Sequence, residues 1–390
     1  MTQQLKRELG VFGATMLGLG SIVGTGIFVS MGLSAGIAGP SVIFAIAIAA
    51  LVATCNGLNS AQLAANHPVS GGTYEYGYRY LNPRLGFIAG WVFLLAKSAS
   101  AATAALGFAG YFLDAFGVTN RGLLVPLALG AVIVFTLIVL SGIRRSNRTN
   151  TIVVSITLAA LALFVVTGLR FVQVENFSPF LPTTTAGGMA AFLQATALMF
   201  VAYTGYGRIA TLGEEVHHPR RTIPRAIIAT LVTTMVLYIS VAFVGVGTVG
   251  SGALAQAALI EAAPLEEAAY TFGLPLVPQL IAFGAITAML GVLLNLLLGI
   301  SRVLLAMGRR RDMPPAVARL NRANTTPPVA VTVMGVVVAL LVLVGDVRIT
   351  WSFSAFTVLI YYALTNLAAL QLKPDERLFP GYIAWIGLIA

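Results

Sequence analysis

Residues 18–28 read Gly18-Leu19-Gly20-Ser21-Ile22-Val23-Gly24-Thr25-Gly26-Ile27-Phe28, in the middle of an apolar run from about Val11 to Met31. A run of that length can cross a bilayer as a helix. Each glycine, however, costs a helix interior about 1 kcal/mol relative to alanine, and four glycines fall within this stretch. We therefore expect the helix to break near Gly24. In a membrane, a broken backbone is tolerated only where protein or a water-filled cavity satisfies the freed amides.

A break at this position would expose main-chain donors to a small anion. The amides of Gly24, Thr25 and Gly26 would lose their helical partners, and the N-terminus of the next half-helix would add a favourable dipole. The stretch thus indicates a carboxylate-binding site inside a membrane transporter. Close packing of neighbouring spans is the alternative, because glycine and serine also allow helices to approach one another, and the motif alone does not separate the two.

The composition is that of an all-α polytopic membrane protein. The chain has 390 residues, of which 58% are hydrophobic and 9% charged, whereas soluble domains carry about 25% charged residues. The apolar segments are continuous rather than alternating, which argues against a barrel. Ten spans are expected, at about residues 11–31, 40–66, 85–112, 123–140, 150–169, 189–212, 223–249, 276–307, 329–344 and 352–370.

The net charge is +10, and the distribution of the basic residues indicates an orientation in a membrane rather than a surface that binds nucleic acid. Basic residues gather in alternate loops, as in the runs 144–148 and 309–311, whereas the opposite loops contain only Arg121, Arg170 and Arg348. Positive loops face the cytoplasm. We therefore expect an integral protein of the plasma (inner) membrane, with many spans and a cytoplasmic N-terminus.

A second span carries a similar interruption. Residues 200–207 read Phe200-Val201-Ala202-Tyr203-Thr204-Gly205-Tyr206-Gly207, in the sixth predicted span. The first and sixth spans enter the membrane from opposite sides, so the chain divides into two five-span halves of inverted orientation, residues 1–170 and 171–372. Residues 373–390 would form a loop and the truncated start of an eleventh span. Interrupted spans at corresponding positions of inverted repeats indicate a substrate site near the bilayer midplane.

These motifs resemble those of the amino acid–polyamine–organocation (APC) superfamily, especially bacterial amino acid permeases related to the cationic amino acid transporters. The resemblance covers nearly the whole chain. It rests on residues 23–28, on Ser70-Gly71-Gly72 within 68–76, on residues 200–206, on Glu214-Glu215 followed by Pro219, and on Ser301-Arg302 with Ala306-Met307. The resemblance implies a five-plus-five inverted repeat like that of the leucine transporter, with discontinuous helices in spans 1 and 6.

The resemblance also implies how an amino acid would be held. The amides of Gly24, Thr25 and Gly26 would receive the α-carboxylate. Main-chain carbonyls in both interrupted spans would receive the α-ammonium, namely those near Ser21, Ile22, Val23, Val201, Ala202 and Thr204. The remaining candidates for the substrate site are Ser100, Phe200, Tyr203, Gly205 and Tyr206.

One departure from the family pattern concerns the gate over the substrate. Family members often place a bulky aromatic residue where Val201 stands. Valine is too small for that role, so Phe200, Tyr203 or Tyr206 would have to serve.

Other departures from the family pattern concern the coupling of transport to an ion. The candidate residues for coupling or gating are Lys97, Thr157 and Asn295. Relatives of the cationic transporters often carry glutamate at the position of Ala96, and many proton-coupled members carry lysine at that of Thr157. We expect Lys97 to have a functional role, because placing a charged lysine within a membrane span costs free energy. It would titrate during the cycle or supply the coupling charge, unless it pairs with carbonyls or snorkels to the interface. Asn295 would line the cavity or bond a neighbouring helix.

Together these features predict a secondary active transporter of free amino acids that works by alternating access and is no enzyme. Proton-linked uptake (symport) is the favoured interpretation, and exchange of amino acids by an antiporter is the alternative. A proton-relaying membrane subunit of an energy-converting complex fits less well, because no acidic residue lies mid-span.

No cofactor or metal is expected. Cys55 is the only cysteine, His217-His218 lacks further ligands, and no phosphate-binding loop occurs. The expected partners are the amino acid, protons and the lipid bilayer, and no nucleic acid.

Overall fold

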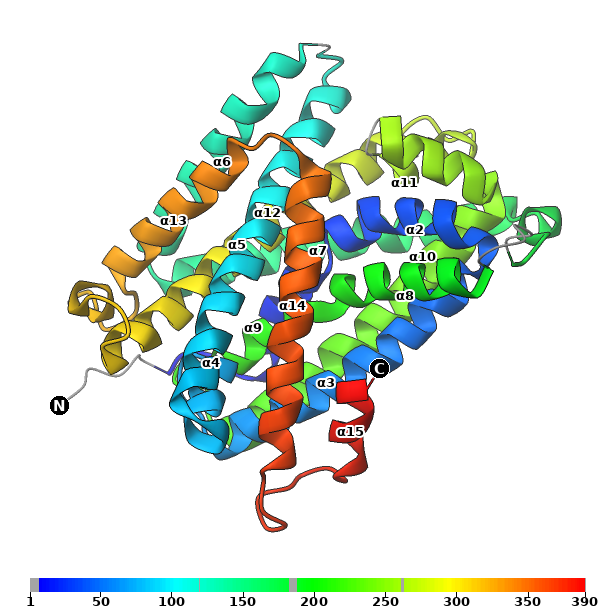
Figure 1. Ribbon diagram of the computed structural model, residues 1–390. Helices are drawn as coiled ribbons and strands as arrows, with labels where there is room; N and C mark the ends of the chain where they lie inside the picture. Colours follow the sequence, from blue (N-terminus) through cyan, green and yellow to red (C-terminus); the bar gives the residue numbers. More distant parts are fainter. Residues whose placement is uncertain (1–6, 119, 182–187, 261–262, 390) are drawn as a thin grey trace.

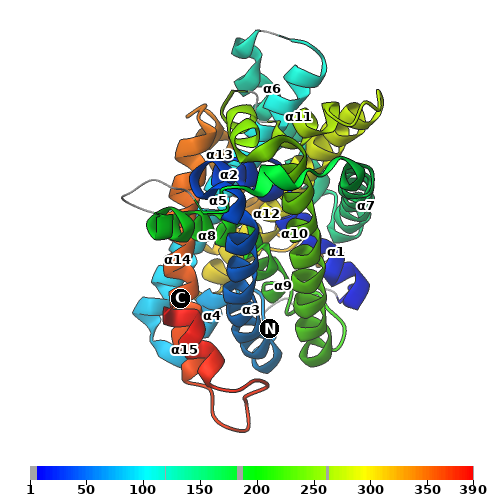
Figure 2. The same ribbon diagram turned by 90° about the vertical axis from the view of Figure 1, so that its right-hand side faces the viewer.

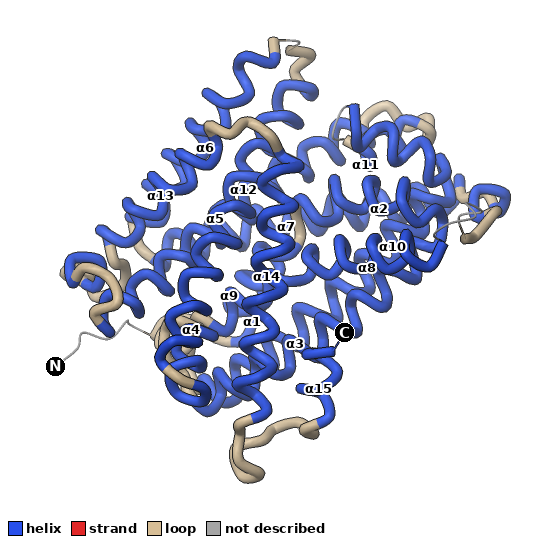
Figure 3. Tube along the Cα trace, viewed as in Figure 1, coloured by secondary structure: helices blue, strands red, loops and turns tan. Residues whose placement is uncertain are grey.

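The computed structural model describes residues 7–118, 120–181, 188–260 and 263–389. These residues form helices joined by loops, as Figure 3 shows, and their only β-type pairing is an isolated parallel bridge between Leu9 and Val216. Residues 1–6 and 119 of the first predicted half, residues 182–187 and 261–262 of the second, and residue 390 of the predicted tail lie outside the described residues.

The helices account for every predicted span. In the described part of the chain, seven helical segments are long and apolar enough to cross a membrane. The first of them, Val11–Asn66, contains two predicted spans, and the shorter apolar helices Leu124–Leu140 and Pro328–Val342 supply the fourth and ninth. The chain is thus built as a multi-pass helical membrane protein.

The elements up to the fifth span are α-helices and short 3₁₀ or π segments, and the latter are labelled η. They are α1 (Val11–Ile22), η1 (Gly26–Ser30), α2 (Met31–Ala38), η2 (Gly39–Ser41), α3 (Val42–Asn66), α4 (Thr73–Tyr76), η3 (Gly77–Leu81), α5 (Pro83–Ala115), η4 (Arg121–Leu123), α6 (Leu124–Leu140) and α7 (Ile143–Gly168).

The later elements follow the same plan. They are η5 (Leu169–Phe171), η6 (Val174–Phe177), α8 (Gly188–Tyr203), η7 (Thr204–Tyr206), α9 (Gly207–Ala210), α10 (Pro219–Ile260), α11 (Pro264–Tyr270), α12 (Val277–Arg310), η8 (Pro315–Ala318), α13 (Pro328–Val342), α14 (Val347–Leu370) and α15 (Tyr382–Ile389). Gly250, at φ +78°, kinks α10, so the seventh span ends where the sequence predicts.

Two long helices form the centre of the molecule. α12 packs against α5, α7 and α1, and α5 also packs against α14. In Figures 1 and 2, α6 and α13 run side by side along one flank, while α3, α8 and α10 lie together on the other. The broken first span lies between the central helices and the second of these flanks, because α1 contacts α12 as well as α10, together with α7 and η7.

The first span breaks where its glycines predict. α1 ends at Ile22, Val23 is extended (φ −77°, ψ 100°), and a π segment begins at Gly26. Neighbouring helices close tightly on the break. A Cβ added to Gly24 would lie 2.4 Å from the Val292 side chain, and one added to Gly26 would lie 2.4 Å from the Ala202 Cβ. Glycine is therefore needed here for close approach of α8 and α12.

The sixth span is interrupted less than we expected. α8 ends at Tyr203 and a 3₁₀ turn leads into α9, but the residues flanking this turn keep right-handed helical dihedrals. The helix tightens rather than unwinds. Gly205 lets the turn meet the first span, since a Cβ there would lie only 2.3 Å from the Ser21 carbonyl oxygen. The two interruptions are thus in direct contact.

Candidate functional site

A small internal cavity lies between the break in the first span and the 3₁₀ turn of the sixth. Its volume is about 30 Å³, which is room for little more than one water molecule. Its lining comes from both interrupted spans, α5, α12 and α14: Ser21, Ile22, Thr25, Gly26, Lys97, Ser100, Val201, Ala202, Thr204, Val292, Leu296 and Trp351.

The lining residues from spans 1, 3 and 6 are all among those that the sequence singles out, so the structure brings them together around one cavity. Val292, Leu296 and Trp351 were not predicted. They lie in spans far along the chain, and an apolar residue within an apolar span carries no local signal of a site. Val23, Gly24 and Gly205 form the two interruptions themselves, behind the lining residues.

The three aromatic residues considered as gates are buried and lie behind the cavity. Phe200 and Tyr206 pack on Tyr362 of α14, with ring centroids 6.0 and 5.3 Å away. Tyr203 packs on Tyr238 of α10 at 5.1 Å. None of the three lines the cavity, so in this conformation they support the wall rather than cover the site.

The break leaves main-chain donors unused. Among the described residues, no backbone hydrogen bond outside the helical segments has the amide of Gly24 or Thr25 as its donor, and Gly26 begins the π segment η1. The Gly24 carbonyl, in contrast, accepts from the amides of Ile27 and Phe28, each at 3.1 Å. The free amides precede a segment that continues directly into α2, at the helix end whose dipole favours negative charge. This arrangement can bind a carboxylate.

Some carbonyls expected to receive an ammonium already accept internal donors. The Ile22 carbonyl accepts the Tyr238 hydroxyl at 2.8 Å. The Thr204 carbonyl accepts the Tyr362 hydroxyl at 2.7 Å and the Lys97 ammonium at 3.4 Å. Tyr238 and Tyr362 are therefore site-supporting residues that the sequence did not indicate, because their partners are main-chain atoms of distant spans.

Lys97 is held by uncharged oxygens. Its side chain is only 5% exposed, and its Nζ donates to the Thr204 hydroxyl at 3.0 Å, which in turn donates to the Val201 carbonyl at 2.8 Å. No acidic residue lines the cavity in the described part of the chain. Lys97 thus both bonds a carbonyl and lines the cavity, and it does not snorkel. Ser100, one turn further along α5, shares a 2.6 Å hydrogen bond with Ser354.

The other two coupling candidates lie in a contact between helices. The Thr157 hydroxyl on α7 lies 3.2 Å from that of Thr287 on α12. Asn295 donates to the Asn150 side chain and, at 2.7 Å, to the Gly291 carbonyl, while Asn150 bonds a carbonyl of α1 at 2.9 Å. Asn295 therefore joins α12, α7 and α1 beside the break, and neither it nor Thr157 lines the cavity.

Similarity to other proteins agrees with this geometry. Residues 13–386 match the profile of the family described as "Amino acid permease". The chain belongs to the amino acid permease family. An uncharacterized transporter of Mycobacterium tuberculosis is 39% identical over 392 residues, which cover 99% of this permease and 85% of that relative.

Relatives with more specific names come from Bacillus subtilis. Its branched-chain amino acid permease is 32% identical, with 87% of this chain and 75% of the relative aligned. Its methylthioribose transporter is also 32% identical, with 84% and 72% aligned. The APC resemblance is thereby confirmed, and the family identifies an amino acid transport protein rather than an enzyme.

At the end of the bundle that carries the basic loops, the permease has a layer of paired charges. We call the following ion pairs the charge layer: Glu215–Arg302 (2.7 Å), Glu214–Arg309 (2.6 Å) and Glu75–Arg310. The first pair is almost completely buried, with side chains 1% and 0% exposed, and Arg302 also donates to the Thr325 carbonyl at 3.1 Å. These contacts tie α12 to the segments that follow α3 and α9.

The carboxylate of Glu75 titrates in this layer, outside the spans. Burial opposes its ionisation, but the neighbouring His67 and the Arg310 guanidinium outweigh burial and hold the pKa of Glu75 below its ordinary value of 4.5. The hydrogen bond and charge of Glu75 also raise the pKa of Arg310. The pair is therefore ionised on both sides at neutral pH.

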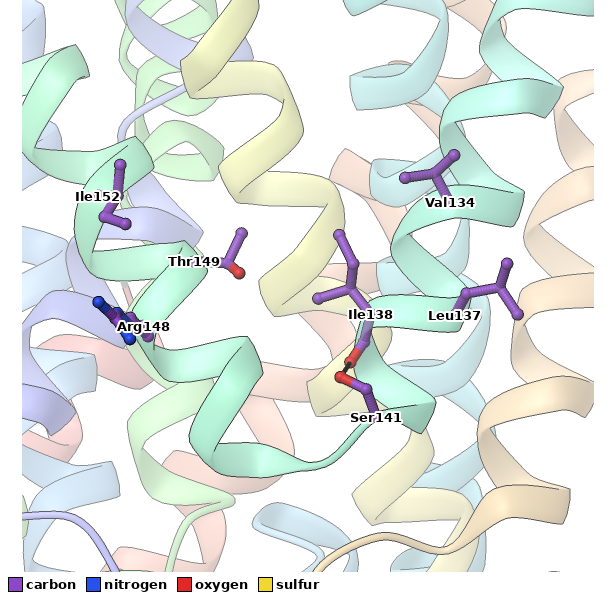
Figure 4. Close-up of a pocket in the computed structure, with 7 residues that line it drawn as sticks. All are labelled: Val134, Leu137, Ile138, Ser141, Arg148, Thr149 and Ile152. Carbon is purple, nitrogen blue, oxygen red and sulfur yellow. Dashed lines mark hydrogen bonds between the residues drawn. The ribbon is translucent and has the colours of Figure 1, made fainter.

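A larger hollow lies on the outer face of the permease. Figure 4 shows this groove between α6 and α7; its volume is about 540 Å³, and it is lined by Val134, Leu137, Ile138, Ser141, Arg148, Thr149 and Ile152. Val134, Leu137 and Ile152 are more than half exposed, so the groove presents apolar surface outward, as suits acyl chains. It contains no residue of the interrupted spans, and we do not assign the substrate to it.

Proposed function

We propose that this permease is a secondary transporter of free amino acids that works by alternating access around the cavity between spans 1 and 6. The observation that carries the proposal is the break at Val23–Gly24. Its unused amides belong to the segment that lines the same cavity as the Thr204 turn. Amide donors on one side and carbonyl acceptors on the other match the two charged groups of an amino acid.

The size of the cavity supports a moving carrier. Sites for small molecules typically occupy about 300 Å³ or more, whereas this cavity measures about 30 Å³. An amino acid therefore enters only if the interrupted spans separate from α5 and α12. Such a movement would open the site to one side of the membrane at a time.

The architecture that we propose is an inverted repeat of residues 1–170 and 171–372. Its support is the placement of the interruptions in the first span of each half, and their direct contact through Gly205 and Ser21. The basic loops support a cytoplasmic N-terminus, and we propose the plasma (inner) membrane as the location of the protein.

For coupling, we propose proton-linked uptake with Lys97 as the charged residue of the cycle. Lys97 bonds the turn of the sixth span, so a change in its charge would alter how that turn is held. Thr157 and Asn295, in the contact of α7 with α12, would transmit the movement. Exchange of amino acids is the second candidate, favoured by the presence of Thr157 where many proton-coupled members carry lysine.

Uptake into proteoliposomes tests these proposals. Labelled leucine should accumulate when an inward proton gradient is imposed, and Lys97→Met should lower the rate and flatten its pH profile. Leucine that enters only against internal leucine, without response to the gradient, would establish exchange. An unchanged pH profile in Lys97→Met would remove this residue from coupling. If none of the twenty amino acids is transported in either mode, the proposed function is wrong.

A further inference from the structure

We propose that Lys97 makes the cavity selective for amino acids with uncharged aliphatic side chains and excludes those with cationic side chains. This inference rests on the proposed function, since it requires that the cavity binds an amino acid, and it adds the substrate class. Three features of the site carry it: an uncompensated positive charge, the fixed position of that charge, and apolar walls.

The first feature is the balance of charge around the cavity. Lys97 is the one charged residue among the described residues that line the cavity. A second cation, Arg208, is 3% exposed and lies one helical turn beyond Thr204, where it donates to the Thr211 hydroxyl at 2.8 Å. The α14 side of the turn contributes Tyr362, a neutral phenol. The site is therefore positive before any substrate enters.

In the part of the chain that the structure describes, no carboxylate lines the cavity to offset the charge of Lys97. The acidic residues nearest in the chain to the sixth-span turn are Glu214 and Glu215, and both are bonded to arginines of α12 in the charge layer. An α-amino acid adds one positive and one negative charge and leaves the balance unchanged. A lysine or arginine substrate would bring a further cation into a buried site, where charges interact more strongly than in water.

The second feature is that the Lys97 ammonium is fixed in the site. It donates to both oxygens of Thr204, the hydroxyl at 3.0 Å and the carbonyl at 3.4 Å. Its chain neighbours Ala96 and Ser98 are buried at 0% and 1% exposure. The charge therefore cannot retreat to the membrane interface when a substrate arrives, and a cationic side chain would meet it at close range.

The third feature is the apolar remainder of the wall. Val201, Val292, Leu296 and Trp351, together with Ile22, come from four different segments and surround the polar groups. Removal of aliphatic surface from water is favourable, and these side chains offer such burial. They offer no acceptor for the end of a lysine or arginine side chain.

A matched pair of ligands tests the inference. Norleucine and lysine share the same straight carbon chain and differ by the terminal ammonium. Equilibrium binding to the purified full chain should be at least tenfold tighter for norleucine than for lysine. Leucine and valine should also bind. Glutamate should bind no better than norleucine, because the apolar walls desolvate its side-chain carboxylate and this cost offsets the attraction of Lys97.

Variants identify the cause of the selectivity. Lys97→Met should reduce the norleucine-to-lysine ratio to threefold or less, and Lys97→Gln, which keeps a donor to Thr204, should do the same and serves if the methionine variant does not fold. Lys97→Arg should retain the tenfold ratio. Lys373→Met, which removes a charge in the loop after α14, is the matched control and should leave the ratio unchanged.

Equal binding of lysine and norleucine by the wild type, tighter binding of glutamate, or a tenfold ratio that persists in Lys97→Met and Lys97→Gln would each overturn the inference. The absence of binding by any amino acid would instead contradict the proposed function itself. The two failures are therefore distinguishable.

Discussion

Two polar regions of the permease differ in how their charges are paired. In the charge layer each carboxylate has an arginine, as in the Glu215–Arg302 pair. In the cavity, Lys97 donates to the oxygens of Thr204, and among the described residues the amides of Gly24 and Thr25 have no backbone acceptor outside the helical segments. The first region satisfies its own charges, whereas the second retains donors and a charge that a guest molecule can use.

The difference suggests that the charge layer stabilises the fold and that the cavity binds a ligand. A buried pair with all its partners present holds two elements together, and removal of one partner leaves a costly charge. A site with spare donors binds a ligand that supplies the missing acceptors. The comparison therefore predicts that changes in the cavity affect transport more than stability, and that changes in the charge layer do the reverse.

The largest effect is expected from Gly205→Ala. The added Cβ would lie 2.3 Å from the carbonyl oxygen of Ser21 and 2.4 Å from its carbon, so the turn of the sixth span must move away from the break. Uptake in proteoliposomes should fall by a factor of about 100 or more, by analogy with the effect of small misplacements in other sites.

Gly110→Ala in α5 is the control, because a Cβ there meets nothing within 4 Å. It should transport at the normal rate. Normal transport by Gly205→Ala would show that close contact of the two interruptions is not required.

The next largest effect is a difference in stability between a variant of the charge layer and a variant of the cavity. Arg302→Met leaves Glu215 buried without its arginine and should lower the free energy of unfolding by about 3–5 kcal/mol. Lys97 is bonded to Thr204 rather than to a carboxylate, so Lys97→Met leaves no buried charge without its partner, and the Thr204 carbonyl keeps its bond from Tyr362. This variant should therefore lower the free energy of unfolding by less than about 1 kcal/mol.

Denaturation of both variants in detergent, without ligand, measures the contrast. A loss for Lys97→Met as large as that for Arg302→Met would mean that the cavity lysine is a structural residue.

A smaller, pH-dependent effect is expected from Glu75. Its pKa is lowered in the folded protein, so its contribution to stability is present above the unfolded value of about 4.5 and is lost as the pH falls through the folded pKa. Glu75→Gln should therefore cost about 1 kcal/mol at pH 7, since the Arg310 side chain is 38% exposed and such pairs are screened by solvent.

Melting temperatures from pH 7 down to pH 3 check this expectation. The difference between wild type and Glu75→Gln should shrink toward the acid end. A difference that stays constant or grows would assign the effect to packing rather than to charge.

The sequence was most informative where single residues dictate backbone geometry. The glycines around Val23 predicted the break of the first span, and Lys97 stood out as a lysine within an apolar helix. The same reasoning overestimated the interruption of the sixth span, because Gly205 allows close approach to Ser21 there and the helix does not unwind. Glycine content alone does not distinguish these two uses.

What could not be predicted depends on contacts between distant segments. Trp351 and Val292 line the cavity but look like any other apolar span residues. Tyr238 and Tyr362 became relevant only once their hydroxyls were seen to bond main-chain oxygens of spans 1 and 6. Asn295 was expected at the cavity or in a helix contact, and its bond to Asn150 assigns it to the contact.

Protection of a cysteine in the cavity tests the central claim most directly. Cys55 is the only cysteine, so Cys55→Ser provides a background into which Ser100→Cys, in the cavity, or Ser141→Cys, in the outer groove, is introduced. Leucine should slow the reaction of a thiol reagent with Ser100→Cys at least several-fold and leave that with Ser141→Cys unchanged. Equal reaction rates at Ser100→Cys with and without leucine, in protein that still transports leucine, would contradict the assignment of the substrate to this cavity.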